Sequence, residues 1–560
     1  MKAIEFKPQM FETLKNYKRK DFVSDVMAGI IVGIVALPLA IAFGIASGVT
    51  PEKGIITAIV AGMIISLFGG SKVQIGGPTG AFIVIIYGII QQYGMSGLMV
   101  ATLMAGFFLV LFGLLHLGTI IKYIPYPIVV GFTSGIAITI FTTQIKDLLG
   151  LQMPAVPSDF VEKWIAYSNY LDTIDLWTMG VGFVSVVIII LTPKVTKKIP
   201  GSLVAIIIMT IVGLVLRNYF SVSTIETIGD RFSINNALPE ACVPSLSWEN
   251  IKMLVSPAIT IAILGAIESL LSAAVADGVI GARHNSNTEL IAQGLANLAS
   301  PIFGGIPATG AIARTMTNIN NGGRSPIAGL IHALVLLLIF LFLMPLAQYI
   351  PMACLAGVLV MVSYNMCGWR SFCGILHNPK SDVIVLLVTF VLTIVFDLTV
   401  AIEVGLICAC LLFMRRVAES TDVKVICDEI DPNDEGSDIQ MDQSEHLSIP
   451  KGVEVYEING PYFFGIGNRF EEIVSAMGDR PKVRIIRMRK VPFIDSTGLH
   501  NLTNLCMMSK RAGIQIVLSG VNESVRETLH KAGFEDLIGT QNICSHIQIA
   551  LARSEQVLAS

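Results

Sequence analysis

Apolar segments follow one another along most of this chain, from Asp25 to Met414. They predict about fourteen membrane spans, several of them shorter than the roughly 20 residues that a full helical crossing needs. The predicted spans cover residues 25–45, 54–70, 78–92, 97–117, 126–144, 174–192, 202–217, 258–274, 288–302, 308–320, 325–346, 352–366, 382–397 and 399–414. The pattern therefore indicates a polytopic α-helical membrane protein.

Two of the short spans begin at the same three-residue step. Thr79-Gly80-Ala81 and Thr309-Gly310-Ala311 each stand just behind a proline, and 230 positions separate the two threonines. Proline and glycine interrupt helices, and non-helical backbone is tolerated at membrane depth only where it lines a cavity or is buried in protein. We therefore expect two half-helices that start at these steps.

The steps belong to spans 3 and 10, each the third span of a seven-span half. Because an odd number of spans inverts the second half relative to the first, this order predicts a 7+7 inverted repeat. In such a repeat the substrate site is expected at the interface of the two halves, near the middle of the membrane.

Basic residues mark one side of the predicted spans. These residues are Lys72, Lys122, Lys194, Lys197, Lys198, Arg283, Arg324, Arg370, Lys380, Arg415 and Arg416. The longer loops at 145–173 and 218–257 fall on the other side and carry acidic residues. By the positive-inside rule the basic side is cytoplasmic. The N-terminus lies on that side, and its polar, basic sequence lacks the apolar core of a signal peptide.

The composition agrees with a membrane protein, since 53% of the 560 residues are hydrophobic and 14% are charged. Soluble domains carry about 25% charged residues. No basic stripe with interleaved aromatic residues is present, so nucleic acid is not an expected partner. The nine cysteines form no CxxC pair and are expected to be small apolar packing residues. We find no catalytic triad, metal cluster or phosphate loop, and we expect neither an enzyme nor a cofactor.

A small soluble domain is predicted after the last span. Residues 428–447 are acidic and rich in turn formers, as in linkers or flexible loops. From about Val453 the segments VEVYEI, VRIIRMR and IQIVLSG have the pattern of strands, and helices are expected from about Asn468, Thr497 and Glu523. The predicted parts are a cytoplasmic segment (1–20), a transmembrane domain (21–416), a linker (417–452) and an α/β domain (453–556).

The two half-helix N-termini are expected to bind an anion. Each would carry about half a positive charge and several backbone N–H groups without an intrahelical acceptor. The donors, including two hydroxyl groups, would come from Thr79, Gly80, Ala81, Thr309, Gly310 and Ala311. The alternative is that these small residues only allow tight helix packing.

Two ionisable residues lie within predicted spans 8 and 10. An unpaired charge in the bilayer costs on the order of 3 kcal/mol, so Arg314 is expected to face the cavity, an anion or a carboxylate. Snorkelling of Arg314 to the interface is the alternative. Glu268, in the middle of span 8, needs a proton, a partner or a bound cation. An ion pair between Glu268 and Arg314 is a competing interpretation.

Two further residues are candidates for the anion site. Pro38 in span 1 would break that helix and place Phe43 as an aromatic cap on the pocket. A simple kink, with Phe43 packed in the core, is the alternative. Gln74 is a polar residue in the apolar approach to the first half-helix.

Several fragments, in this order, resemble the sulfate permease (SulP) family. They are AGIIVGIVALPLAIAFGIASGV (28–49), GGSKVQIGGPTGAF (69–82), GFTSGIAITI (131–140), GAIESLLSAAVADG (265–278), PATGAIARTMTNINNGGRSPIAG (307–329), FDLTVAIEVG (396–405) and IDSTGL (494–499), the last in a tail that resembles a STAS domain. Within the family the chain looks closest to the bacterial C4-dicarboxylate transporter branch, on GFTSGIAITI, QIKDLLGLQM (144–153), GAIESLL and LLFMRR (411–416).

The resemblance implies roles for particular residues. It places an arginine near the anion at Arg314, and it ties the acidic position of Glu268 to the use of a coupling ion. It also implies a homodimer. In soluble relatives of the tail the serine at the place of Ser496 is phosphorylated, which makes Ser496 a candidate regulatory site. The alternative is an ordinary helix N-cap at Asp495 or Ser496.

Together these features predict a secondary active transporter of small anions in a bacterial inner membrane, with the N-terminus and the STAS-like domain in the cytoplasm. Glu268 would couple uptake of sulfate, a C4-dicarboxylate or bicarbonate to a proton or to a sodium ion bound near it. One helix bundle would move against another. The alternatives are a passive anion channel or exchanger, and a nucleobase-type transporter of the same fold. Arg314 and the STAS-like tail count against the last of these.

Overall fold

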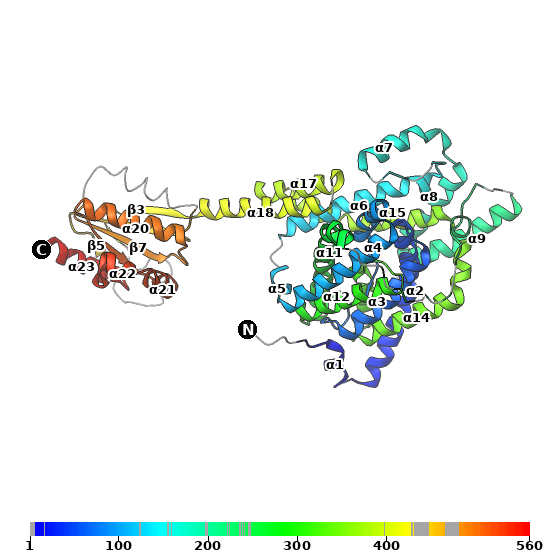
Figure 1. Ribbon diagram of the computed structural model, residues 1–560, viewed down its shortest axis with the longest axis horizontal. Helices are drawn as coiled ribbons and strands as arrows, with labels where there is room; N and C mark the ends of the chain where they lie inside the picture. The colour runs from blue at the N-terminus through cyan, green and yellow to red at the C-terminus, as the bar shows by residue number, and fades with distance from the viewer. Residues whose placement is uncertain are drawn as a thin grey trace. The chain divides into compact units, whose positions relative to one another are not determined.

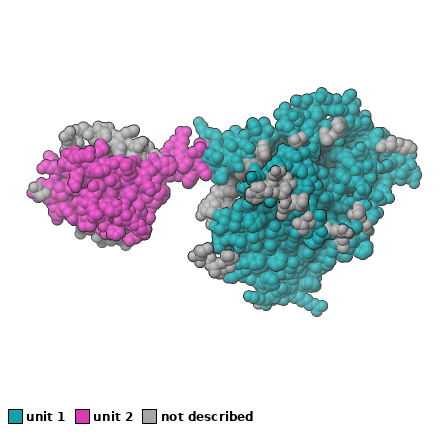
Figure 2. Space-filling model, in the orientation of Figure 1, with its two compact units in different colours: residues 1–409 teal, residues 410–560 magenta. Residues whose placement is uncertain are grey.

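The computed structural model describes residues 6–559 except 16, 122–124, 154–155, 158, 196–199, 221, 223, 235–236, 238, 240, 243, 245–247, 397, 427–428, 431–446 and 465–480. The chain forms two compact units, residues 1–409 and 410–560, which Figure 2 distinguishes by colour.

A helix is found for each of the fourteen predicted spans (Figure 1). The first half contains α2 (Arg19–Ala46), α3 (Pro51–Phe68), α4 (Ile83–Leu114, which holds two spans), α6 (Tyr126–Leu149), α8 (Leu176–Val195) and α9 (Gly201–Tyr219). The second half contains α11 (Trp248–Ile280), α12 (Ser286–Ile302), α13 (Ile312–Asn320), α14 (Ile327–Leu343), α15 (Met352–Met366), α17 (Lys380–Val395) and α18 (Leu398–Ser420). In the described part of the chain, nine helices are long and apolar enough to cross a membrane individually.

Short helices occupy several connections between the spans. They are α1 (Gln9–Leu14), α5 (Gly118–Ile121), α7 (Phe160–Asn169), η2 (Leu171–Thr173), α10 (Ile228–Arg231), η3 (Met344–Tyr349) and α16 (Trp369–Ile375). The helices α7 and α10 lie in the long loops after α6 and α9, and we call the end of the domain that carries them the α7 face.

The two predicted interruptions of long helices have different outcomes. At Gly94 the backbone leaves helical geometry, with φ of 69° and ψ of −172°, so α4 is divided into the two predicted spans. The helix α2, in contrast, is continuous from Arg19 to Ala46 with Pro38 inside it. A break at Pro38 is therefore wrong: proline removes one backbone donor, and the rest of this long helix keeps its hydrogen bonds. Phe43 is buried and belongs to the apolar core, as the alternative interpretation has it.

The membrane helices pack into two bundles. What we call the site bundle contains α2, α3, α4, α11, α12, α13 and α14. What we call the flanking bundle contains α6, α8, α9, α15 and α17. Each bundle combines helices from both halves of the chain, as expected for an inverted repeat.

The second unit is a small α/β domain built on a five-stranded sheet. Its strand order is β3 (Asp422–Ile426), β6 (Val453–Asn459), β7 (Val483–Lys490), β8 (Gln515–Ser519) and β9 (Ile543–Cys544). β3 pairs antiparallel with β6, and the other neighbours are parallel. A separate two-stranded ladder joins β4 (Glu429–Ile430) and β5 (Leu447–Ser448).

Helices cover this sheet, and apolar cores fill the space beneath them. The helices are α20 (Ser496–Arg511), α21 (Glu523–Lys531), α22 (Phe534–Ile538), the short η4 (Thr540–Asn542) and α23 (Ile547–Ala559). The three predicted strands and the helices predicted near Thr497 and Glu523 are confirmed. The helix predicted from Asn468 and most of the acidic segment 428–447 lie outside the described residues.

Candidate functional site

The two half-helices start at a crossing of the two halves of the chain. The two-residue strand β1 (Gly76–Gly77) pairs antiparallel with β2 (Thr309–Gly310), and the Ala311 N–H donates to the Ile75 carbonyl at 2.9 Å. After β1 the short 3-10 helix η1 (Gly80–Phe82) leads into α4, and after β2 the chain enters α13. The backbone ladder therefore brings the two half-helix N-termini together, as the repeated steps predicted.

Glycine is required on both strands of this crossing. Gly77 has a φ of 153°, and a Cβ atom on it would lie 2.1 Å from Nη1 of Arg314. A Cβ on Gly310 would lie 1.6 Å from Nε2 of Gln74. The Gln74 amide donates to the carbonyl of Ser269 at 3.2 Å and so rests against β2, where it joins the crossing to α11. Side chains at Gly77 or Gly310 would displace these neighbours.

Three polar side chains that the sequence analysis did not single out hold the strands in place. Asn297 of α12 both donates to the Ala308 carbonyl (2.7 Å) and accepts from the Ala308 N–H (2.9 Å). The Thr315 hydroxyl accepts from the Ile75 N–H at 3.1 Å, and the Asn318 amide donates to the Val73 carbonyl at 2.9 Å. A polar residue such as Asn297 inside an apolar span is a signal that could have identified this role, because burying an amide requires partners.

Thr79 and Glu268 meet at the start of the first half-helix. The Thr79 hydroxyl donates to Oε2 of Glu268 at 2.9 Å, and both residues are partly accessible. Thr79 is the N-cap of η1, so the N–H groups of Gly80 and Ala81 lie in the first turn, where a helix supplies no backbone acceptor. This end of the half-helix combines N–H donors, a hydroxyl group and a carboxylate.

The same end faces the flanking bundle. A Cβ on Gly80 would lie 3.4 Å from Cδ1 of Ile140 on α6, 3.5 Å from Sδ of Met366 on α15 and 3.6 Å from the ring of Phe43. The first half-helix therefore begins at the contact between the two bundles, which we call the seam. Phe43, although part of the apolar core, lies beside the seam.

The second step is placed differently from the first. Thr309 is fully buried, and its hydroxyl donates to the Gly265 carbonyl of α11 at 2.9 Å. The Ala311 N–H is already bonded to Ile75. Gly310 lies against Gln74, as described above. These groups hold the crossing together, and the accessible donors of the site come from the first step.

Arg314 lies behind the first half-helix. Its side chain is 1% exposed, and Nη2 donates to the carbonyl of Pro78 at 2.8 Å. Among the described residues it forms no ion pair with Glu268 or with any other carboxylate. Arg314 does not snorkel to the interface, and its charge lies next to the residue that precedes Thr79. It adds positive potential to the half-helix N-terminus.

In the second unit, Asp495 caps α20. One carboxylate oxygen accepts from the Gly498 N–H at 2.7 Å and the other from the Phe464 N–H at 3.2 Å. Ser496 is the first residue of the helix and is exposed. The cap is therefore supplied by Asp495, and the hydroxyl of Ser496 is left accessible.

No cluster of metal ligands supplements this site in the part of the chain that the structure describes: no three His, Cys, Asp or Glu side chains gather there.

The chain matches two family models. A model described as the sulfate permease family matches residues 22–389, and a model of the STAS domain matches residues 446–550. These two matches coincide with the helical domain and the α/β domain.

Individual relatives match along almost the whole chain. The protein named "Putative sulfate transporter YvdB" from Bacillus subtilis (strain 168) is 41% identical over 538 residues, which are 95% of this chain and 98% of the relative. "Bicarbonate transporter BicA" from Picosynechococcus is 32% identical over 524 residues, 90% of each chain. The matching family and these relatives are transporters, which confirms that the chain is not an enzyme.

Solved structures agree with the fold. The transmembrane domain of a cyanobacterial bicarbonate transporter BicA is 31% identical and has a TM-score of 0.62, with 70% of this chain and 98% of that chain covered. The murine Slc26a9 anion transporter is 18% identical, has a TM-score of 0.85 and covers 98% of this chain and 94% of its own. Likeness at 18% identity supports the architecture alone. On its family match and its relatives, the chain belongs to the sulfate permease family and carries a C-terminal STAS domain.

Proposed function

We propose that the protein is a secondary active transporter that carries a small oxyanion together with a proton or a sodium ion. The candidate substrates are sulfate and bicarbonate, for which two relatives are named, and C4-dicarboxylates, which the sequence fragments favour. The basic residues between the spans support a bacterial plasma membrane orientation with the N-terminus and the STAS domain in the cytoplasm. The working unit in this proposal is a homodimer.

The contact between Thr79 and Glu268 carries the proposal. A carboxylate at the start of a half-helix occupies the electropositive end that a substrate anion would use. Two like charges about 4 Å apart repel by about 4 kcal/mol at an effective dielectric constant of 20. An anion therefore binds beside Glu268 at low cost only after a proton or a cation has neutralised the carboxylate. This requirement links the two fluxes.

The remaining parts of the site favour binding of an anion over binding of a neutral solute. The Gly80 and Ala81 N–H groups are donors, and Arg314 adds a positive charge behind them. Because the half-helix begins at the seam, a movement of the site bundle against the flanking bundle would expose it first to one side of the membrane and then to the other.

Uptake into proteoliposomes tests this function. Purified protein is reconstituted, and uptake of radiolabelled sulfate, bicarbonate, succinate and fumarate is followed while proton and sodium gradients are imposed separately. We expect one of these anions to accumulate with one of the gradients. Glu268→Gln should abolish accumulation but keep anion exchange, because a permanently neutral side chain no longer requires the cation. Glu403→Gln is the matched control, since it removes an exposed carboxylate from α18.

Three outcomes would contradict the proposal in different ways. Anion flux that follows no gradient in the wild-type protein indicates a passive channel or exchanger. Gradient-driven accumulation that survives Glu268→Gln removes the coupling role from Glu268. If the folded protein transports none of the four anions, the proposed class of small oxyanion substrates is excluded.

A further inference from the structure

A cavity lies on the seam at the α7 face, and we call it the seam cavity. Ile45 and Ala46 of α2 and Tyr87 of α4 line it from the site bundle, and Thr143 and Lys146 of α6 line it from the flanking bundle. The Tyr87 hydroxyl donates to the carbonyl of Val156, in the loop after α6, at 2.7 Å. The cavity therefore lies between the two bundles, and a hydrogen bond joins them beside it.

The seam cavity is close to the start of the first half-helix. Ile45 is two residues beyond Phe43 on α2, and Thr143 is three residues beyond Ile140 on α6. Phe43 and Ile140 both face Gly80. Three residues correspond to about 4.5 Å along a helix, so roughly one helical turn separates the cavity from the half-helix. A solute that enters from the α7 face along the seam reaches the cavity first.

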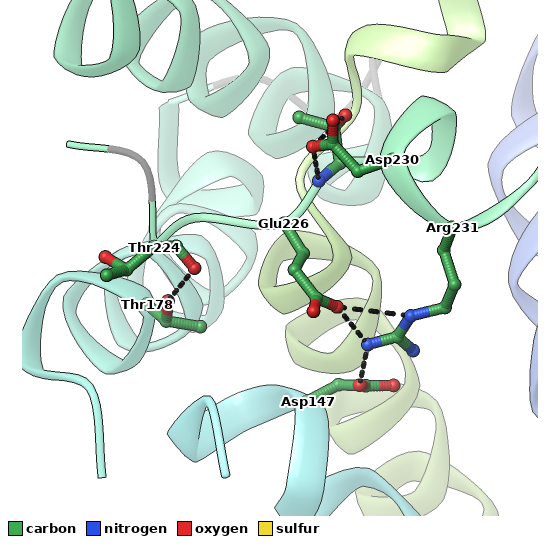
Figure 3. A network of polar contacts seen from close by, with 7 residues as sticks. Asp147, Thr178, Thr224, Glu226, Asp230 and Arg231 are labelled. Carbon is green, nitrogen blue, oxygen red and sulfur yellow. Dashed lines mark hydrogen bonds and ion pairs between the residues drawn. The ribbon is translucent and has the colours of Figure 1, made fainter. Parts of the chain in front are cut away.

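Arg231 forms part of the cavity wall and is held by two carboxylates. Its guanidinium donates to Asp147 of α6 at 2.9 Å and, through Nε, to Glu226 at 3.2 Å, as Figure 3 shows. The backbone around Glu226 is itself fixed, since the Met352 N–H donates to the Glu226 carbonyl at 2.9 Å. Arg231 is thereby kept in the wall.

The charges on the two sides of this wall differ. The seam cavity has two cationic side chains, Lys146 and Arg231, and one carboxylate, Asp147. A second cavity beyond the wall has the same three residues and also Asp175 and Glu226, which gives it an excess of negative charge. Glu226 also binds Arg231, so Lys146, Arg231, Asp147 and Glu226 together carry no net charge, and Asp175 makes the second cavity negative. An anion is therefore less disfavoured in the seam cavity than in the second cavity, and Lys146 can attract it there.

We infer that the seam cavity is a capture site for the transported anion, in which Lys146 binds a small oxyanion before it reaches the half-helices. This inference rests on the proposed function. Lys146 attracts the anion, Arg231 with its two carboxylates shapes the wall, and the bond between Tyr87 and Val156 opens when the anion moves on along the seam.

Kinetics from each side of the membrane test the capture site. Uptake of radiolabelled sulfate, and in parallel bicarbonate and succinate, is measured in right-side-out and inside-out membrane vesicles that contain the full-length protein. We expect Lys146→Gln to raise KM about five-fold for entry from the α7 face, which corresponds to about 1 kcal/mol of lost attraction. The kcat for entry from the α7 face and the KM for entry from the opposite face should stay the same. The kcat from the opposite face should fall by the same factor, because the imposed gradients fix the ratio of kcat/KM for the two directions.

Two further variants separate capture from a structural role. Lys146→Arg keeps the charge and should keep the KM of the wild-type protein. Arg217→Gln removes an exposed cation that pairs with Asp230 at 2.7 Å, outside both cavities, and should leave every constant unchanged. Size-exclusion profiles and thermal stability of all variants are compared with those of the wild-type protein.

The possible results distinguish the capture site from the function on which it rests. If the wild-type vesicles transport none of the three anions, the proposed function fails and the capture site fails with it. If wild-type transport is normal but Lys146→Gln leaves KM unchanged, raises it equally from both faces or lowers only kcat, the capture site is overturned and the function stands. The same holds if Arg217→Gln raises KM as much as Lys146→Gln does.

Discussion

The hydroxyl of Thr79 donates a 2.9 Å hydrogen bond to Oε2 of Glu268, although the two residues are 189 positions apart. Thr79 is the N-cap residue of the half-helix of the first repeat, and Glu268 belongs to α11 of the second. The donors expected to bind the anion and the carboxylate expected to bind the coupling ion are thus parts of one site. The dependence of anion binding and of coupling on this hydrogen bond can be measured.

We expect Thr79→Val to weaken coupled transport and Thr79→Ser to preserve it. Valine keeps the shape of threonine but removes the hydroxyl group, and a hydrogen bond to a charged group contributes about 1.5 to 3 kcal/mol. Once a proton or a cation has neutralised Glu268, the hydroxyl group can donate to the bound anion instead, so the KM for the anion should rise by about ten-fold or more in Thr79→Val. Initial rates of gradient-driven uptake in proteoliposomes measure this effect. Equal KM values for the two variants would show that the hydroxyl group has no part in binding.

Gly77→Ala should destabilise the crossing. The methyl group would lie 2.1 Å from Nη1 of Arg314, and the φ of 153° at this position is unfavourable for any residue other than glycine. Overpacking of this kind costs about 1 to 3 kcal/mol. Thermal unfolding in detergent measures the loss. Gly88→Ala in α4 is the control, because its Cβ would meet nothing within 4 Å. A Gly77→Ala protein as stable as the control would contradict the packing described for Arg314.

Asn297→Asp should also lower stability. The change removes the amide donor to the Ala308 and Gln293 carbonyls and leaves a buried carboxyl group among them. Loss of a buried hydrogen-bond partner costs about 1 to 3 kcal/mol. Asn321→Asp at the end of α13 makes the same chemical change at a less buried position, where one amide bond to Thr317 is lost. The thermal midpoint should fall further for position 297 than for position 321, and the reverse order would count against a role for Asn297 in holding the strand.

Stability of the α7 region should depend on pH through Lys163. Burial of this side chain, which is 2% exposed, lowers its pKa from 10.5 to about 8, and Asp159 opposes that shift. Between pH 8 and 10.5 the unfolded chain therefore binds more protons at this residue than the folded one. Stability rises with pH in this window by at most about 3 kcal/mol.

Thermal unfolding at several values between pH 7.5 and 10, a range chosen from that pKa, tests the prediction. Lys163→Met should be more stable than the wild-type protein near pH 7.5, and its stability should no longer increase with pH. Lys72→Met, at an exposed loop position, should keep the wild-type increase of stability with pH. A wild-type stability that stays flat or falls over the whole window would contradict burial of the charged lysine.

The sequence determined the membrane architecture by itself. Apolar length, short spans at the two Thr-Gly-Ala steps and an odd number of spans per half follow from local composition and order, and the helices appear where these features predict them. The strands and helices of the STAS domain follow from periodicity for the same reason. Glu268 and Arg314 were recognisable because charge is costly within an apolar span.

Only the tertiary structure decided what these residues contact. Pro38 does not break α2, because a helix of 28 residues tolerates the loss of one bond. The two steps look alike in sequence, yet Thr309 is buried against Gly265 while Thr79 reaches Glu268. Within the described part of the chain, Arg314 turns to the Pro78 carbonyl and not to a carboxylate. Such partners come from segments that are 44 to 236 positions apart, and no local pattern encodes a distance across the fold.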